Sequence, residues 1–151
     1  MKRLLLLAFA FILAVGVASA QEGLYVEDLF EGNVVPSKIM RRTFISGSKL
    51  QPYGLDMYKS VRFRAKESQY YAVESLVLKD ADNVVDKTTE YTGEHLTYAV
   101  ICHPKTYNGL NRFLCFQAKR DKRKWDVTVV YLRGSATVED LDKMFNKRKL
   151  L

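Results

Sequence analysis

LTYAVICH at residues 96–103, FLCFQA at residues 113–118 and WDVTVVYL at residues 125–132 are three segments in which apolar, aromatic and β-branched side chains dominate. Segments of this length and composition predict β-strands. TTEY at residues 88–91 predicts one more strand just upstream. The polar breaks between the segments are short, and short turns connect antiparallel strands. We therefore expect an antiparallel β-meander of about four strands in the C-terminal half of the chain.

The dipeptide Asn108-Gly109 predicts how the second and third of these strands pair. Asn-Gly is the strongest short hairpin signal, because a type I′ turn needs a positive φ at both central residues. With these two residues as the turn, Tyr107 faces Leu110. Counting back along both strands then places Cys102 opposite Cys115, at the closer type of cross-strand pair and within disulfide reach.

The next hairpin supports the same meander. A four-residue turn over 121–124 would set Lys119 against Asp126 and Phe116 against Val129, so that opposite charges and apolar side chains both match across the strands. Because side chains alternate between the two faces of a sheet, one face is expected to be apolar. Its predicted members are Ala99, Ile101, His103, Leu114, Phe116, Ala118, Val127, Val129 and Tyr131.

The segment 66–81 is expected to form a helix that packs on this sheet. Tyr70, Val73, Val77 and Ala81 recur at helical spacing and form one apolar stripe. The acidic residues Glu67, Glu74 and Asp80 are expected on the opposite, solvent-facing side.

Shorter elements complete the predicted fold. Residues 38–46 and 61–64 predict one or two strands before the helix. A short C-terminal helix should begin after Thr137, with Asp140 as the acidic partner of a capping box. The predicted fold class is α+β.

The first twenty residues have the layout of a secretory signal peptide. Lys2 and Arg3 precede an apolar run over 4–17, and the small residues Ala18-Ser19-Ala20 end it. This pattern predicts cleavage after Ala20. The alternative, an uncleaved membrane anchor, is disfavoured because the run is short for a span. No other apolar run is long enough to cross a membrane. We expect a single mature domain over 21–151, located in a periplasm or secreted.

An exported chain with two cysteines favours a disulfide, here Cys102–Cys115. The alternative is a pair of reduced, half-buried thiols. A metal site is not expected, because the only histidines are His95 and His103, and the residues Cys102 and His103 point to opposite faces of their strand. No cofactor is expected either, since the chain has no P-loop and no dinucleotide fingerprint.

The chain is basic, with a formal net charge of +7 that falls to +5 when Lys2 and Arg3 leave with the leader. Its densest basic cluster lies at the last predicted hairpin. One reading is a solvated hairpin tip, and the other is a contact for an acidic glycan, a lipid headgroup or an acidic envelope protein. Nucleic acid is not expected as a partner of an exported chain without an aromatic–basic RNA-binding motif. The candidate anion-contact residues are Arg120, Lys122, Arg123 and Lys124.

Four short motifs resemble a family of small exported proteins of unknown function from Bacteroidetes: QEGL at 21–24, DLFEG at 28–32, SGSKL at 46–50 and YKSV at 58–61. The resemblance implies a Gram-negative envelope and a periplasmic address, and it transfers no catalytic or binding residue.

The chain also lacks a nucleophile elbow and a zinc-protease motif. The favoured interpretation is a non-enzymatic envelope domain that binds a partner or ligand. The alternative is a small envelope hydrolase with an active site that no motif reveals.

Overall fold

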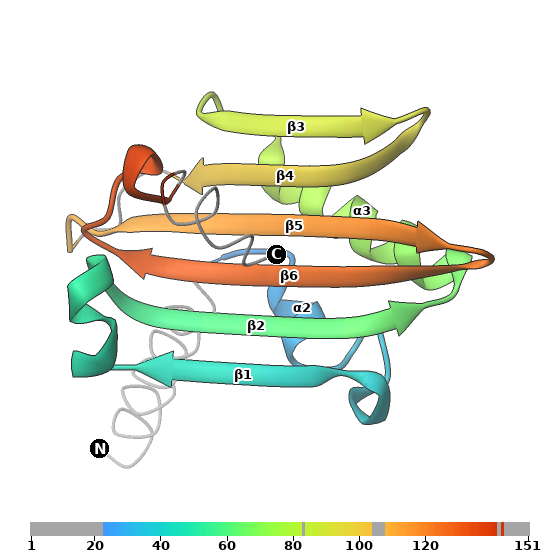
Figure 1. The fold of residues 1–151 in the computed structure, drawn as a ribbon, viewed down its shortest axis with the longest axis horizontal. Coiled ribbons are helices and arrows are strands. Elements are labelled where there is room, and N and C mark those ends of the chain that lie inside the picture. Colours follow the sequence, from blue (N-terminus) through green and yellow to red (C-terminus); the bar gives the residue numbers. More distant parts are fainter. Residues whose placement is uncertain (1–22, 83, 104–107, 142, 144–151) are drawn as a thin grey trace, which may run out of the picture.

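The computed structural model describes residues 23–82, 84–103, 108–141 and 143, and its core is a six-stranded antiparallel sheet (Figure 1). The strand order is β1-β2-β6-β5-β4-β3. The α+β class and the four-stranded meander, β3 to β6, are confirmed. The strands are β1 (Arg41–Ser46), β2 (Leu55–Ala65), β3 (Lys87–Thr92), β4 (His95–His103), β5 (Asn111–Asp121) and β6 (Lys124–Gly134), and the helices are α2 (Glu27–Phe30), η1 (Ser37–Ile39), η2 (Ser48–Tyr53) and α3 (Glu67–Ala81).

Helix α3 connects β2 to β3, which lies at the far edge of the sheet, so it crosses one face of the strands between them. Figure 1 shows α2 and α3 on this same face, behind the strands. The predicted helix over 66–81 is confirmed, with Lys66 as its N-cap residue. The four residues of the predicted stripe are all buried, and they pack on the predicted apolar face of the sheet.

The spacing of Asp80 predicts a side chain that faces solvent, but in the structure Asp80 is buried. Its side chain is only 6% exposed. The carboxylate accepts hydrogen bonds from the backbone N–H groups of Tyr25 (2.7 Å) and Val26 (3.0 Å). The segment before α2 therefore covers the last turn of α3, which helical periodicity alone does not reveal. Burial raises the pKa of the Asp80 carboxyl, and the two backbone hydrogen bonds oppose that shift.

The predicted pairing of Cys102 with Cys115 is wrong. Cys102 lies opposite Phe113, and Cys115 lies opposite Val100. Asn108-Gly109 predicts a two-residue turn, whereas β4 ends at His103 and β5 begins at Asn111, and the register differs from the predicted one by two positions. The predicted contact between Tyr107 and Leu110 involves a residue outside the described part of the chain. The two cysteines do not lie opposite each other, and the predicted disulfide between them is not formed in this structure.

A shift of two residues leaves every side chain on its predicted face, because strand side chains alternate with a period of two. The apolar face predicted from β4, β5 and β6 is therefore confirmed for most of its members. The predicted pairs of the next hairpin, Lys119 with Asp126 and Phe116 with Val129, are also confirmed. The turn itself is tighter than predicted, because Asp121 already pairs with Lys124.

The N-terminal strands differ from their predicted lengths. The first begins only at Arg41, after the short helix η1, and β2 extends over Leu55–Ala65 instead of four residues. Burial alternates only in the second half of β2, so its first half gave no period-two signal.

A second core cluster covers part of the opposite face of the sheet. Leu50 of η2, Ala136 and Leu141 pack there with buried residues of β4, β5 and β6. The predicted capping box is confirmed: the Thr137 N–H donates to Asp140 Oδ2 (2.9 Å), and the Asp140 N–H donates to Thr137 Oγ1 (3.2 Å). Helical structure follows over 138–141. Among the described residues, no helix is long and apolar enough to cross a membrane.

Candidate functional site

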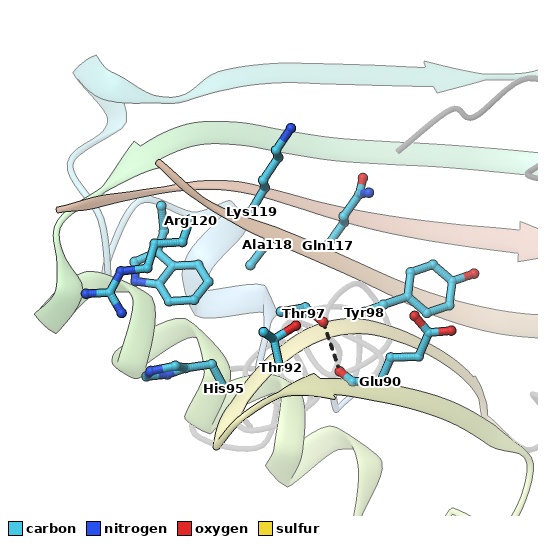
Figure 2. A pocket seen from close by; sticks show the side chains of 10 residues that line it. Glu90, Thr92, His95, Thr97, Tyr98, Gln117, Ala118, Lys119 and Arg120 are labelled. Atoms are coloured by element: carbon cyan, nitrogen blue, oxygen red, sulfur yellow. Dashed lines mark hydrogen bonds between the residues drawn. The ribbon is translucent and has the colours of Figure 1, made fainter. Parts of the chain in front are cut away.

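The candidate site is a cleft of about 530 Å³ at the place where β4 and β5 part. Their pairing ends at Tyr98 and Gln117. Beyond that point β4 continues against β3 alone, and β5 continues against β6 alone. Figure 2 shows side chains from these strands around the opening. The lining residues are Glu90 and Thr92 from β3, His95, Thr97 and Tyr98 from β4, Gln117, Ala118, Lys119 and Arg120 from β5, and Trp125 from β6.

A β-bulge in β4 accounts for the separation. Glu90 pairs with Tyr98, but the next residue, Tyr91, pairs with Leu96, so Thr97 is an extra residue in β4. The Thr97 hydroxyl donates to the backbone carbonyl of Glu90 (3.3 Å), which fixes the bulge (Figure 2). A bulge bends its strand and is often found beside binding sites. Here it turns β4 away from β5 and opens the sheet.

Helix α3 supplies hydrogen bonds to the backbone of Leu96 next to the gap. The Leu96 N–H donates to Glu74 Oε2 (3.0 Å), and the Tyr70 hydroxyl donates to the Leu96 carbonyl (2.7 Å). The same hydroxyl lies 2.6 Å from Glu74 Oε2. Burial, followed by the contact with Glu74, raises the pKa of Tyr70, so its hydroxyl stays protonated as a donor. Glu74 was predicted to face solvent, but it is half-buried in this contact.

An aromatic cluster forms the floor of the cleft. Trp125 stacks on Tyr70, with ring centroids 4.1 Å apart, and His95 meets the Trp125 ring edge-on at 5.1 Å. Trp125 is only 2% exposed. Within the described part of the chain, Trp125 Nε1 and His95 Nδ1 are buried without a hydrogen-bond partner. Buried polar atoms usually have partners, so these two nitrogens are exceptions within the described residues.

Arg120 is a positively charged lining residue whose side chain is positioned by several contacts. Its guanidinium lies over the Trp125 ring, 5.5 Å from the centroid. Its Nε donates to the Lys122 carbonyl (3.3 Å), and its Nη2 lies 3.8 Å from a Glu67 carboxylate oxygen. The side chain remains 48% exposed. These contacts fix the orientation of the Arg120 side chain, while a ligand in solution can still reach it.

The four residues predicted as an anion contact occupy different places in the last hairpin. Arg120 lines the cleft, Lys122 and Arg123 form the turn between β5 and β6, and Lys124 pairs with Asp121. Sequence reasoning missed Lys119 as a second cation of the cleft. It also missed Glu90 and the neutral lining residues, since the bulge that brings them together leaves no motif in the sequence.

The remaining polar candidates lie apart from the cleft. His103 is buried opposite Arg112, and burial followed by the Arg112 charge lowers its pKa to about 4. Cys102 packs with the second core cluster, and burial raises its pKa. Across the described ranges, no three His, Cys, Asp or Glu side chains gather in a way that could hold a metal ion.

Comparison with known proteins identifies a family and no individual relative. No curated protein and no solved structure matches the chain. A family model described as a family of unknown function (DUF6108) matches residues 13–145. This match spans most of the sequence, and the chain therefore belongs to the family of unknown function DUF6108.

Proposed function

We propose that this protein is an exported, non-catalytic ligand-binding domain of the cell envelope, and that its site is the cleft between β4 and β5. The ligand would place an anionic group against Arg120. The observation that carries the proposal is the fixed guanidinium of Arg120 above Trp125, at the mouth of a cleft of about 530 Å³. Clefts of this size with a few placed polar groups are the usual form of small-molecule sites.

The orientation of Arg120 favours binding. A side chain that is already held loses less conformational freedom when a ligand arrives. The guanidinium of an arginine also presents several N–H donors in a fixed plane to a carboxylate or sulfate. The ammonium group of a lysine binds the same anions with less directionality. Lys119 also lines the cleft, but its side chain points to the opposite face of β5 from Arg120 (Figure 2).

Binding is favoured over the alternative, a small envelope hydrolase. The histidine of the cleft, His95, packs against aromatic rings, and no described carboxylate bonds to its Nδ1. A catalytic histidine usually has its second nitrogen oriented by such a partner. The Thr97 hydroxyl is occupied by the carbonyl of Glu90.

Export is proposed from the leader pattern of residues 1–20. Mass spectrometry of the protein recovered from an expressing Gram-negative cell tests it. The proposal expects a periplasmic or secreted chain that starts at Gln21. A chain that keeps Met1–Ala20 in the cytoplasm would contradict it.

The site is tested by retention on a heparin-like anionic column. Arg120→Gln and Arg123→Gln remove the same charge from neighbouring positions, but only Arg120 lines the cleft. We expect Arg120→Gln to elute at clearly lower salt than Arg123→Gln. Equal shifts for the two variants would mean that the hairpin tip binds anions through its net charge, and the cleft proposal would then fail.

A further inference from the structure

A notch lies at one edge of the sheet, where β1 begins. β1 is an edge strand (Figure 1), and its pairing with β2 starts at Arg41, opposite Arg62. Beyond Arg62, β2 continues to Ala65 without a partner in β1. A cavity of about 390 Å³ lies at this step. We call it the edge notch, and the residues that line it are Ile39, Arg41, Arg62, Phe63, Arg64 and Asp126.

Arg41 and Arg62 point to the same face of the sheet. The two neighbours of Arg62 in β2 are buried in the core cluster that contains the apolar stripe of α3, so Arg62 points to the opposite, outer face. Arg41 is its direct cross-strand partner and shares that face. Arg120 pairs with Trp125, which belongs to the helix-covered core cluster. The sheet therefore separates the edge notch from the guanidinium of Arg120.

The two arginines of this pair have no opposite charge beside them. Both side chains are exposed, and no carboxylate among the described residues forms an ion pair with either one. The next arginine of the lining differs, because Arg64 Nη1 lies 3.1 Å from Asp121 Oδ2 and 3.9 Å from Asp126 Oδ1. Like charges directly opposite each other destabilise a sheet. The pair is thus an uncompensated double positive charge at the notch.

We propose that the edge notch binds a phosphate monoester, with the guanidinium groups of Arg41 and Arg62 donating N–H groups to one phosphate. Directly opposite residues have Cβ atoms about 5 Å apart, so two long arginine side chains can converge on a single group. The guanidinium fork matches the geometry of phosphate oxygens. A bound phosphate also cancels the repulsion between the two arginines. This site is separate from the cleft and does not depend on the proposed function.

The charge of the pair selects the kind of anion. A phosphate monoester carries close to two negative charges above its second pKa of about 6. A sulfate monoester or a carboxylate carries one, and leaves the second guanidinium without a counter-charge. Ile39, which is 39% exposed, gives the lining an apolar side chain that the organic part of an ester can contact.

The test is a set of NMR titrations of the purified protein at about pH 8, where the phosphate monoester is doubly charged. Phenyl phosphate and phenyl sulfate have the same ring but differ by one charge. We expect phenyl phosphate to bind roughly fivefold tighter, a gain in the range of one exposed ion pair, and to shift the backbone amide signals of Arg41 and Arg62. Equal affinities for the two probes would overturn the proposal.

Three variants assign the site. Arg41→Gln and Arg62→Gln should each lower the affinity for phenyl phosphate roughly fivefold. Arg42→Gln is the matched control, because Arg42 lies next to Arg41 in β1 but is paired with the buried Val61, and its guanidinium donates to Ser37 Oγ. It should change the affinity by less than about twofold. Equal losses in all three variants would mean attraction by net charge and would overturn the site.

Two further comparisons define the ligand and separate this site from the cleft. Inorganic phosphate should bind more weakly than phenyl phosphate, with the same dependence on Arg62. Equal affinities of these two probes would support the phosphate site and overturn the ester form. If binding of phenyl phosphate depends on Arg120 and not on Arg62, the inference fails and the cleft gains support as an anion site.

Discussion

The rings of Tyr70 and Trp125 lie 4.1 Å apart and within 13° of parallel, so that a helix residue and a strand residue form one stacked pair. This pair lies beneath the cleft, where β4 and β5 no longer bond to each other. The Tyr70 hydroxyl also reaches the backbone of Leu96. Tyr70 therefore supports the open end of the sheet through both its ring and its hydroxyl.

Tyr70→Phe tests this support. The ring stack is retained, but the buried Leu96 carbonyl and the Glu74 carboxylate lose their shared donor. We expect a loss of about 1–3 kcal/mol in the free energy of unfolding, measured by urea denaturation. Tyr71→Phe is the matched control, because Tyr71 is exposed, and it should change stability very little. Equal effects of the two substitutions would show that the Tyr70 hydroxyl has no structural role.

The buried His103 makes stability depend on pH. Its pKa is about 4 in the folded state, below the ordinary 6.5, so it remains neutral while the unfolded chain takes up a proton. Stability is therefore fully present above pH 6.5 and declines as the pH falls toward 4. When the pH is lowered from 7 to 5, protonation of His103 in the unfolded chain should decrease the free energy of unfolding by about 2 kcal/mol.

His103→Gln removes this titration. The difference in urea stability between pH 7 and pH 5 should be smaller in the variant than in the parent protein by about that 2 kcal/mol. The same pH dependence in both proteins would show that His103 is not held neutral by its surroundings.

The two thiols report the β4–β5 register. Cys115 is fully buried and Cys102 is half-buried. In native, non-reduced protein we expect an alkylating reagent to modify Cys102 slowly, because burial raises its thiol pKa, and to leave Cys115 unmodified. After denaturation without reductant, mass spectrometry should find both alkylated. Two unreactive cysteines would instead indicate the disulfide and the register that the Asn-Gly turn predicted.

Sequence patterns predicted most of the fold because they depend on short-range periodicity. The apolar stripe from Tyr70 to Ala81, the capping box of Thr137 and Asp140, and the alternation in β4 to β6 are all visible within a few residues. The failures depend on distant partners. Asp80 is buried because Tyr25 and Val26 return to cover it, more than fifty positions away in the chain.

The candidate site was much less predictable. Arg120 was identified from charge density alone, within a cluster whose other members lie outside the cleft. No glycine or proline at Thr97 or beside it indicates the bulge in the sequence. The bulge lies next to Leu96, whose backbone bonds to Tyr70 and Glu74 of the distant helix α3. No local pattern carries that information.

Glu67 is expected to weaken ligand binding. Its carboxylate lies 3.8 Å from the Arg120 guanidinium and competes with an incoming anion. Glu67→Gln should therefore bind a heparin oligosaccharide roughly twofold tighter, consistent with a weak, exposed ion pair. Asp82→Asn removes the same charge at an exposed position at the other end of α3 and should leave the affinity unchanged. If both variants gain affinity equally, the effect comes from net charge and not from Arg120.

The most direct test of the cleft uses its tryptophan. Trp125 is the only tryptophan of the chain, so a ¹⁵N–¹H spectrum contains a single indole signal. Trp125 lines the cleft, and its indole signal therefore reports on the surroundings of the cleft. We predict that titration with a heparin oligosaccharide moves this signal to saturation, and that Arg120→Gln abolishes the shift while Arg123→Gln preserves it. An indole signal that does not move, or that moves equally in the Arg120→Gln variant, would contradict the account.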